Sequence, residues 1–340
     1  MSARRQAKIY ARERVPLQDV IPLETPFSVE IDVCSVCNFR CGFCFQADTA
    51  EIRRSQVGLG RMDPALFAKI LEDLKRFPDT VKKVRLFEFG EPLLHPRLPD
   101  FVRATRDSGV TGHVEITTNG VLLTEELNLA LLEAGLSQIN ISVSGVTADR
   151  YWELSRHRLD MERFLDVLAH LYAHRGDCHV YIKLADDGTL SREDEETFYR
   201  LFGDRCDDIF IERLSPIWRD TDVNETLESD VGPYGQRLVD KDVCPLIFTR
   251  MVINWDGVVV ACCVDWRRQY VIGDLRTDPA YDVWNGARLR DLQVRHLRGE
   301  RRGLELCDGC TALSSCTIDD IDAYAGEVLA RVRPDGGGTA

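Results

Sequence analysis

The stretch "FSVEIDVCSVCNFRCGFCF" (Phe27–Phe45) joins a short apolar segment to four closely spaced cysteines. Its first seven residues are rich in Val, Ile and Phe, and they predict a short buried strand. The cysteines follow with the spacing Cys34-x2-Cys37-x3-Cys41-x2-Cys44. Thiols this dense indicate a metal site, a disulfide framework or redox chemistry.

Five further segments have the same strand-like composition. They are residues 83–89, 113–118, 138–144, 178–184 and 208–213. Helical patterns lie between several of them, and turn or capping residues mark their ends. The segment after Asp63 has Pro64 at its first helical position, and the patterns that follow end at Gly109, Gly135 and Gly203.

This alternation of strand and helix predicts an α/β fold with a parallel sheet of βαβ units. Six units are too few for the closed eight-unit barrel, so we expect a partial (β/α)6 TIM-like barrel. Chemistry in such folds lies at the carboxyl ends of the strands. The first cysteine run directly follows the first predicted strand and would lie at that edge.

The pattern changes near Val243. "MVINWDGVVVACC" (Met251–Cys263) predicts a β-hairpin with Asp256-Gly257 at its turn. A helical segment and a further cysteine run follow, which predict a small C-terminal domain with a thin core of its own. We therefore divide the chain into an extension (1–26), a barrel (27–235), a small iron–sulfur domain (236–333) and a disordered tail (334–340).

Net charge, apolar content and cysteine content limit the classes of function that this chain could have. The 340 residues carry a formal net charge of -13, which disfavours nucleic-acid binding. No apolar run is long enough for a membrane span, and the charged N-terminus does not resemble a secretory signal. We expect a cytoplasmic protein, and in a reducing compartment the 12 cysteines favour metal binding over disulfides.

The first cysteine run fits two common metal sites poorly. Two C-x2-C pairs separated by three residues are too close for a typical zinc site, and a ferredoxin cluster uses C-x2-C-x2-C-x3-C. The inner spacing, Cys37-x3-Cys41-x2-Cys44, resembles the signature of the radical S-adenosylmethionine (SAM) enzymes. In that family three thiolates hold a [4Fe–4S] cluster, and SAM chelates the fourth iron. Cys34 is then a spare thiol, expected to be a small buried residue, with a cluster-reserve or redox role as the alternative.

Other residues near the predicted strand ends extend this resemblance. Gly90-Glu91-Pro92 resembles the family's GGEP motif, which binds the SAM amino group, although Phe89 replaces the first glycine. Phe43 precedes the last cysteine, where the family places an aromatic residue near the adenine. By the same resemblance, further candidate SAM contacts at the strand ends are Thr117, Asn119, Ser142, Ser144 and Leu214, and Lys183 could meet a carboxylate.

The second cysteine set resembles the SPASM and twitch domains, which extend many radical SAM enzymes and hold auxiliary [4Fe–4S] clusters. Its spacing is Cys244-x12-Gly257-x4-Cys262, followed by Cys307-x2-Cys310-x5-Cys316. Position 320 is Asp320, where a full SPASM domain has a further cysteine, and no cysteine follows Cys316. The resemblance therefore implies one auxiliary cluster held by Cys244, Cys262, Cys307 and Cys310. Cys316 is a remnant or alternative ligand, and zinc is the alternative metal.

Three cysteines remain outside these sets. Cys178 and Cys206 lie at strand beginnings, on the edge away from the site, and are expected to be packing residues. Cys263 directly follows Cys262, and alternation along a strand would turn its side chain to the opposite face. It is then either a buried hairpin residue or a thiol in the active-site cavity.

The resemblance implies SAM cleavage to a 5′-deoxyadenosyl radical that removes a hydrogen atom from the substrate. Sugar-modifying members include the butirosin 2-deoxy-scyllo-inosamine dehydrogenase, so we expect an oxidoreductase of antibiotic biosynthesis that oxidises an alcohol of a carbohydrate, aminocyclitol or nucleoside sugar. A flavodoxin or ferredoxin would supply electrons. Candidate bases are Lys183, Glu212, Asp265 and His95.

Three alternatives stay open. The enzyme could be a radical epimerase, or form carbon–carbon bonds, with Cys263 as hydrogen donor. It could also modify peptides, as SPASM members do, although 26 residues before the first predicted strand leave little room for an N-terminal peptide-recognition domain. A non-enzymatic iron–sulfur scaffold is the third alternative.

Overall fold

The computed structural model describes residues 3–8, 14–218 and 231–332, so the tail predicted at 334–340 lies outside the described residues. Its described strands form one sheet with the order β1-β7-β6-β5-β4-β3-β2-β8-β9-β10. Six neighbouring strands in this order are parallel, as the sequence predicts. They are β2 (Ser28–Ile31), β3 (Lys83–Arg85), β4 (Val114–Thr118), β5 (Gln138–Val143), β6 (His179–Asp186) and β7 (Asp208–Arg213).

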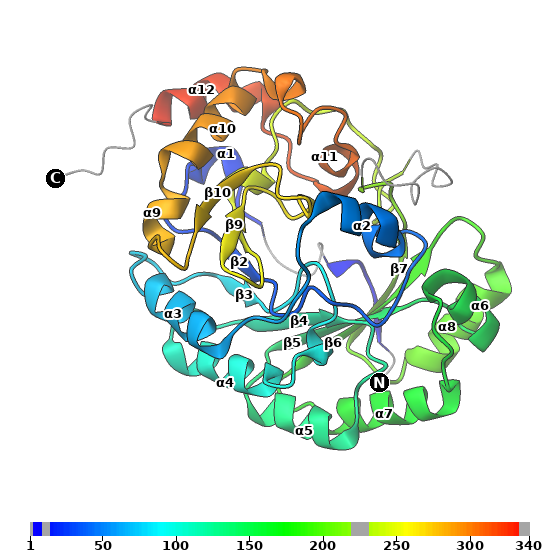
Figure 1. Ribbon diagram of the computed structural model, residues 1–340. Helices are drawn as coiled ribbons and strands as arrows, with labels where there is room; N and C mark the ends of the chain where they lie inside the picture. The colour runs from blue at the N-terminus through cyan, green and yellow to red at the C-terminus, as the bar shows by residue number, and fades with distance from the viewer. Residues whose placement is uncertain (1–2, 9–13, 219–230, 333–340) are drawn as a thin grey trace.

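Helices cover the outer side of this curved sheet, which confirms the partial barrel (Figure 1). The predicted helices are α3 (Pro64–Leu74), α4 (Leu98–Ser108), α5 (Glu125–Glu133) and α8 (Arg192–Phe202). Asp63 caps α3 by accepting from the backbone of Ala65 and Leu66, and Ser191 opens α8 with a capping box. The sequence patterns missed α2 (Thr49–Ser55), α6 (Ala148–Ser155) and α7 (Met161–His174).

The C-terminal part of the chain continues the barrel sheet. Strand β8 (Arg250–Ile253) pairs in parallel with β2, and it forms the predicted hairpin with β9 (Val258–Val260). Gly257 has φ +90° at the hairpin turn, a conformation that favours glycine. The other elements are η5 (Leu246–Phe248), β10 (Val271–Asp274), α9 (Ala280–Trp284), α10 (Ala287–Leu297), η6 (Arg301–Gly303), α11 (Thr311–Cys316), η7 (Asp322–Tyr324) and α12 (Ala325–Arg331).

One hydrophobic core spans both parts of the chain. It includes Val29 and Ile31 of β2, Phe67 of α3, and Met251 and Leu292 of the C-terminal elements. The thin core predicted for the C-terminal part is therefore completed by the barrel. Cys178 and Cys206 are buried in the same core, which confirms that they are packing residues.

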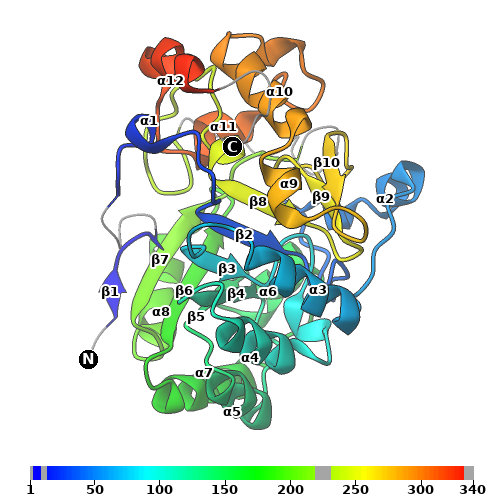
Figure 2. The ribbon, with the colours of Figure 1, turned by 90° about the vertical axis from the view of Figure 1, so that its left-hand side faces the viewer.

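The N-terminal segment also joins the sheet. Strand β1 (Arg4–Arg5) pairs in parallel with β7, and α1 (Leu17–Val20) follows (Figure 2). The Arg4 guanidinium donates to Asp208 over 2.8 Å, at the start of β7. The described part of the predicted extension therefore closes one edge of the sheet.

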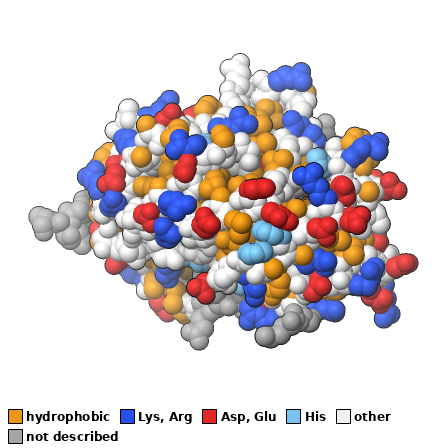
Figure 3. Space-filling model, turned by 90° about the horizontal axis from the view of Figure 1, so that it is seen from below, with side chains coloured by type: hydrophobic (Ala, Val, Ile, Leu, Met, Phe, Trp, Pro, Cys, Tyr) orange, Lys and Arg blue, Asp and Glu red, His pale blue; other side chains and the backbone are white. Residues whose placement is uncertain are grey.

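The face seen from below carries acidic and basic side chains interspersed with apolar ones (Figure 3). Such a mixture is typical of a solvated protein surface. Within residues 3–8, 14–218 and 231–332, the structure has no helix with the length and apolar character needed to cross a membrane.

Candidate active site

The first cysteine run forms a loop between β2 and the short helix η2 (Phe45–Ala47). The side-chain amide of Gln46 holds this loop by donating to the carbonyls of Ser35 (2.8 Å) and Phe89 (2.6 Å). Cys34 is buried, with its Sγ 3.6 Å from the carbonyl oxygen of Val36, as expected for a spare packing thiol.

Cys37, Cys41 and Cys44 lie in this loop, where Cys41 interacts electrostatically with Cys37 and Cys44, and Cys44 with Cys37. Burial raises the pKa of Cys37 to about 11 and that of Cys44 to about 12, and the pKa of Cys41 also rises. The negative charge of the Cys37 thiolate would further raise the pKa of Cys41 and of Cys44, and that of Cys44 would raise the pKa of Cys41. Iron would offset both penalties, because a metal deprotonates the thiols that ligate it. The three thiols therefore fit an iron–sulfur cluster.

Gly90 lets the end of β3 approach this loop closely. A Cβ atom at this position would lie 2.3 Å from the carbonyl oxygen of Cys34 and 2.6 Å from that of Val36. The following residue, Glu91, donates its backbone N–H to the Val36 carbonyl over 2.9 Å. The Gly-Glu-Pro segment therefore packs directly on the cysteine loop.

Glu91 joins this segment to the end of β4. Its carboxylate accepts from the Thr118 hydroxyl (2.6 Å) and from the backbone N–H groups of Asn119 (2.8 Å) and Leu93 (3.0 Å). Burial raises the pKa of Glu91 to about 7, although these hydrogen bonds favour its ionised form. The Asn119 amide also donates to Asn38, beside Cys37, over 2.8 Å. Thr118 belongs to the Thr117–Gly120 segment predicted to lie near SAM, whereas Asn38 was not among the predicted site residues and joins this network only in the structure.

The other predicted SAM contacts are spread over the short helix η3 (Pro92–Leu94), the ends of β4, β5 and β7, and the cysteine loop. Thr117 accepts a hydrogen bond from the Asn140 amide, and Pro92 begins η3. Ser142 lies on β5 and Ser144 lies just past the strand. Phe43 is half-buried in the cysteine loop, and Leu214 is half-buried just after β7. No contact between these last two residues and the cysteine thiols is part of the described structure.

The second cysteine set is also brought together. Burial raises the pKa of Cys244 and of Cys307 to about 12, and Cys310 raises both further. Cys262 interacts with Cys244 and Cys310 as well. The hairpin at Gly257 and the run at residues 307–310 therefore bring four thiols together, each interacting with at least two of the others, a donor set that fits a [4Fe–4S] cluster. Cys316 interacts with Cys310 and Cys263, so it lies at the edge of this set.

Cys263 does not point away from Cys262, as strand alternation would require. The two thiols instead interact and shift each other's pKa, that of Cys262 upward and that of Cys263 downward, because both residues follow β9 rather than lie in the strand. The Cys263 sulfur also lies 3.9 Å from the Arg250 guanidinium and within 4.8 Å of carboxylate oxygens of Glu30 and Glu88. Its surroundings are ionisable on one side and apolar on the other.

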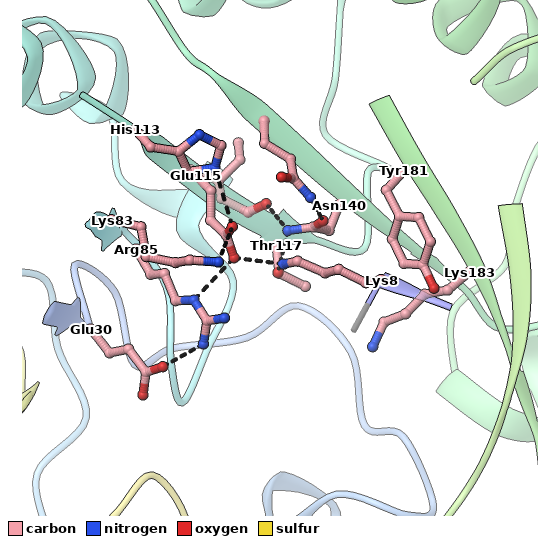
Figure 4. Close-up of polar contacts among 12 residues, drawn as sticks. Lys8, Glu30, Lys83, Arg85, His113, Glu115, Thr117, Asn140, Tyr181 and Lys183 are labelled. Carbon is pink, nitrogen blue, oxygen red and sulfur yellow. Dashed lines mark hydrogen bonds and ion pairs between the residues drawn. The ribbon is translucent and has the colours of Figure 1, made fainter. Parts of the chain in front are cut away.

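Ionisable and polar side chains line the inner face of the barrel (Figure 4). Along β2 they alternate with apolar residues that pack into the core, since neighbouring side chains of a strand point to opposite faces. We call this set the polar inner face, and its members are Glu30, Arg85, Glu115, Asn140, Lys183, Glu212 and Arg250.

Ion pairs connect much of the polar inner face. Arg85 pairs with Glu30 on β2 and with Glu115 on β4, the latter over 3.1 Å. Lys8 reaches Glu115 from the N-terminal segment over 2.6 Å, as Figure 4 shows. Burial lowers the pKa of Lys8 to about 7, and the charge of Glu115 partly opposes that shift.

The two carboxyl groups beside Cys263, those of Glu30 and Glu88, have pKa values shifted in opposite directions. Burial disfavours ionisation of Glu30, but Arg250 and Arg85 together hold its pKa below the usual range. Burial raises the pKa of Glu88 well above its usual range, and the charge of Glu30 raises it further. The pKa of Glu88 therefore lies above that of Glu30, so Glu88 is the first of the two to take up a proton as the pH falls. Because Arg85 and Arg250 already neutralise Glu30, this cluster does not favour a metal cation.

The candidate bases fall into two groups. Lys183 and Glu212 form an ion pair of 2.7 Å on the polar inner face, and the Tyr181 hydroxyl donates to Glu212 over 3.3 Å. Asp265 is buried and accepts from the backbone of residues 269 and 270, so it stabilises a turn. Both ring nitrogens of the buried His95 bond to backbone groups. The contacts therefore favour the Lys183–Glu212 pair as groups available to a ligand.

Charged residues within the predicted strands also indicate the polar inner face. Glu30, Arg85 and Glu115 lie within central parallel strands, which are usually apolar because both faces are covered. A charged residue in such a strand indicates a polar barrel interior. Arg250, in contrast, could only be assigned to this face once β8 was known to pair with β2.

Stacked aromatic rings join the two cysteine regions. Phe45, next to Cys44, stacks on Trp266 with 4.6 Å between the ring centroids. Trp266 follows Cys262 by four residues, and Trp218 lies edge-on to Phe45 at 5.0 Å. The ring stack therefore connects the residue after Cys44 with the segment that follows Cys262.

Two family models match this chain. The radical SAM superfamily matches residues 31–187, and an iron–sulfur cluster-binding domain called SPASM matches residues 244–311. These ranges contain Cys37, Cys41 and Cys44 in the first domain, and the four predicted auxiliary ligands in the second.

A "tungsten-containing aldehyde ferredoxin oxidoreductase cofactor-modifying protein" of Pyrococcus furiosus is 24% identical to this chain over 342 positions, which cover 85% of this chain and 90% of that protein. A GTP 3′,8-cyclase of Chlorobaculum tepidum is 38% identical over 128 residues. That match covers 38% of this chain and only 36% of the cyclase.

Solved structures share the fold. BtrN in complex with AdoMet and 2-DOIA has a TM-score of 0.56 at 19% identity, covering 87% of this chain and 96% of BtrN. Streptococcus suis SuiB bound to the precursor peptide SuiA has a TM-score of 0.60 at 15% identity, covering 79% of this chain and 66% of SuiB. These likenesses concern the fold alone.

Proposed function

The chain carries a radical SAM domain followed by a SPASM iron–sulfur domain, and we propose that it acts on a carbohydrate, aminocyclitol or nucleoside sugar. In this proposal the enzyme removes a hydrogen atom from the substrate and oxidises one of its alcohols to a ketone. Such domains bind SAM and [4Fe–4S] clusters. When bound, SAM and its cluster supply the 5′-deoxyadenosyl radical, and an auxiliary cluster supplies an electron acceptor.

The polar inner face is the observation that carries this substrate class. Side chains of Lys183 and Arg250 are each 30% exposed, whereas Glu30 and Glu115 beneath the cations are at most 1% exposed. A ligand would therefore meet hydrogen-bond donors first, with Glu212 as a partly accessible acceptor. Donors and acceptors at this density suit a polyhydroxylated or amino-bearing molecule better than an apolar one.

We assign the proton-accepting role to the Lys183–Glu212 pair. An alcohol becomes a ketone by losing one hydrogen atom from carbon, one proton from oxygen and one electron. A base must lie within hydrogen-bond reach of the hydroxyl, and Glu212 is the carboxylate on the polar inner face that keeps an exposed part. The buried contacts of Asp265 and His95 leave them less suited to this role.

Epimerisation is a second candidate, and the position of Cys263 favours it. The thiol lies beside Arg250, Glu30 and Glu88 on the inner face, rather than wholly within an apolar core. A thiol S–H can return a hydrogen atom to a substrate radical. A cysteine across the cavity from the abstracting radical would then invert the carbon.

One experiment separates these reactions. The reconstituted enzyme is incubated in deuterated water with SAM, a reductant and a panel of aminocyclitols and nucleoside sugars. A dehydrogenase should form a ketone without new carbon-bound deuterium, and Cys263→Ala should retain turnover. An epimerised product carrying one solvent deuterium, together with 5′-deoxyadenosine but no product from Cys263→Ala, would overturn dehydrogenation.

Substrate class is tested with the same panel. Substrate-dependent 5′-deoxyadenosine formation should occur with a polar small molecule, and Glu212→Gln should reduce its turnover more than its binding. Modification of a peptide, with no response to any sugar or aminocyclitol, would replace this proposal with peptide modification. Absence of 5′-deoxyadenosine in every condition would favour a non-enzymatic scaffold.

A further inference from the structure

The imidazole ring of His296 connects two cysteines of the auxiliary set. His296 lies on α10 and is fully buried. Its Nδ1 lies 3.2 Å from the backbone nitrogen of Cys244, and its Nε2 lies 3.4 Å from the sulfur of Cys307. These cysteines are 63 positions apart in the sequence, so one buried ring links the start of the SPASM segment to its second cysteine run.

The contact with Cys244 fixes where the proton of this ring lies. A backbone N–H can only donate, so Nδ1 must accept through its lone pair and cannot carry a proton. The neutral ring therefore has its proton on Nε2. That N–H group faces the sulfur of Cys307, which makes the imidazole the donor of the second contact.

We infer that His296 is a positioning residue that donates an N–H···S hydrogen bond to the Cys307 thiolate and thereby raises the reduction potential of the auxiliary [4Fe–4S] cluster. Hydrogen bonds to cluster sulfurs are among the factors that set iron–sulfur potentials. Reduction adds negative charge, which delocalises onto the thiolates. A donor aimed at one of them stabilises the reduced state more than the oxidised state.

A second group reinforces the same cysteine without touching its sulfur. The buried Arg301 guanidinium donates to the Cys307 carbonyl over 2.6 Å, which holds the backbone of this residue in place. The thiolate therefore cannot easily move away from the imidazole. The inference concerns electron transfer and holds for dehydrogenation and epimerisation alike, so it goes beyond the proposed function.

The test measures the potential of the auxiliary cluster alone. Cys37→Ala, Cys41→Ala and Cys44→Ala are combined to remove the SAM cluster, and the remaining cluster is titrated with EPR detection. His296→Leu in this background should lower the equilibrium constant for one-electron reduction about tenfold, which corresponds to about 59 mV. An unchanged potential with an intact EPR signal would overturn the inference.

Two further variants separate donation from packing. Gln293 lies on the same helix, is buried, and donates to the Ile247 carbonyl over 3.0 Å without contacting a cysteine. Gln293→Leu should leave the potential unchanged. His296→Gln keeps an N–H donor and should restore part of the lost stabilisation. Equal shifts in His296→Leu and Gln293→Leu would show that packing, and not the hydrogen bond, controls the potential.

A measurement on the wild-type protein remains decisive if a variant fails to hold its cluster. ENDOR spectra of the reduced auxiliary cluster should show a coupled proton that disappears after exchange into deuterated water. Labelling with ¹⁵N-histidine should add a nitrogen coupling from the same ring. Absence of both couplings in a fully reduced sample would contradict the inference.

Discussion

At the scale of single residues, the surroundings of two neighbouring carboxyl groups, Glu30 and Glu88, shift their pKa values in opposite directions. Glu30 is ionised because two guanidinium groups face it, those of Arg85 and Arg250. A carboxylate oxygen of Glu88 lies within 4.8 Å of one of Glu30, and burial together with the charge of Glu30 raises the pKa of Glu88. An ionised carboxylate of the polar inner face and a carboxyl group of raised pKa thus lie next to the Cys263 thiol.

This difference predicts unequal effects of two identical substitutions. Glu30→Gln removes the carboxylate that faces Arg250 and one of the two carboxylates paired with Arg85, and it should destabilise the protein by about 3 kcal/mol. Glu88→Gln replaces a carboxyl group whose raised pKa favours its neutral form with an amide of the same shape, and it should cost less than about 1 kcal/mol. Urea unfolding under anaerobic conditions would measure both. Similar losses for the two variants would show that both carboxyl groups are ionised.

Asp32 gives a prediction of pH dependence. It is fully buried after β2, accepts from the Phe89 backbone N–H over 3.3 Å, and has a second oxygen without a described partner. Burial raises its pKa to about 7. Its folded pKa thus exceeds its unfolded pKa, so its contribution to stability is complete below about pH 4 and is lost as the pH rises through 7.

Asp32→Asn should remove this dependence, because an amide stays neutral and still accepts from Phe89. The free energy of unfolding of the variant relative to wild type should rise by about 1.4 kcal/mol for each pH unit between about 4 and 7. The two proteins should match near pH 4, and the variant should be more stable at pH 8. A difference that does not vary with pH would mean that Asp32 is ionised throughout this range.

At the scale of elements, the site depends on close packing between the end of β3 and the cysteine loop. Gly90 has no room for a side chain because the opposing atoms belong to the backbone of residues 34–36. Backbone atoms cannot rotate away as a flexible side chain can. The loop would therefore have to move, and Cys37 with it.

Gly90→Ala should lower the iron content from about eight to about four per chain, because only the SAM cluster would be lost. SAM cleavage should be lost with it. Gly112→Ala is a matched control, since a Cβ at that glycine meets no atom within 4 Å. Iron analysis after anaerobic reconstitution measures both variants. Full iron and normal SAM cleavage in Gly90→Ala would show that the loop tolerates the shift.

At the scale of the whole molecule, the two iron–sulfur regions belong to one structural unit. Strand β8 extends the barrel sheet beside β2, and the stacked rings of Phe45 and Trp266 join the two cysteine regions. The auxiliary thiols and the polar inner face meet at Cys262 and Cys263. This arrangement suits electron transfer between a substrate on that face and the auxiliary cluster.

The same arrangement predicts two clusters per chain that load separately. Iron should approach eight per chain after reconstitution, the sum of two four-iron clusters. Combined Cys37→Ala, Cys41→Ala and Cys44→Ala should remove about half of this iron, and combined Cys262→Ala and Cys310→Ala should remove the other half. Zinc in place of the second half, measured by metal analysis, would favour the zinc alternative for the auxiliary set.

The sequence by itself determined the parallel barrel and the identity of both cysteine sets. Strand composition, helix caps such as Asp63 and the spacing Cys37-x3-Cys41-x2-Cys44 are local properties, and local properties can be read from neighbouring residues. The hairpin at Gly257 was predictable for the same reason, because its turn requires a positive φ.

Only the tertiary structure decided how these parts combine. The polar inner face draws Glu30, Arg85, Lys183 and Arg250 from four strands, and their pairing follows from sheet order and register. Cys263 turned out to contact Cys262 because the chain leaves the strand before these residues, so strand alternation no longer applies. The donor role of His296 likewise required two contacts that are distant in sequence. Such features depend on long-range packing and electrostatics, which no local pattern encodes.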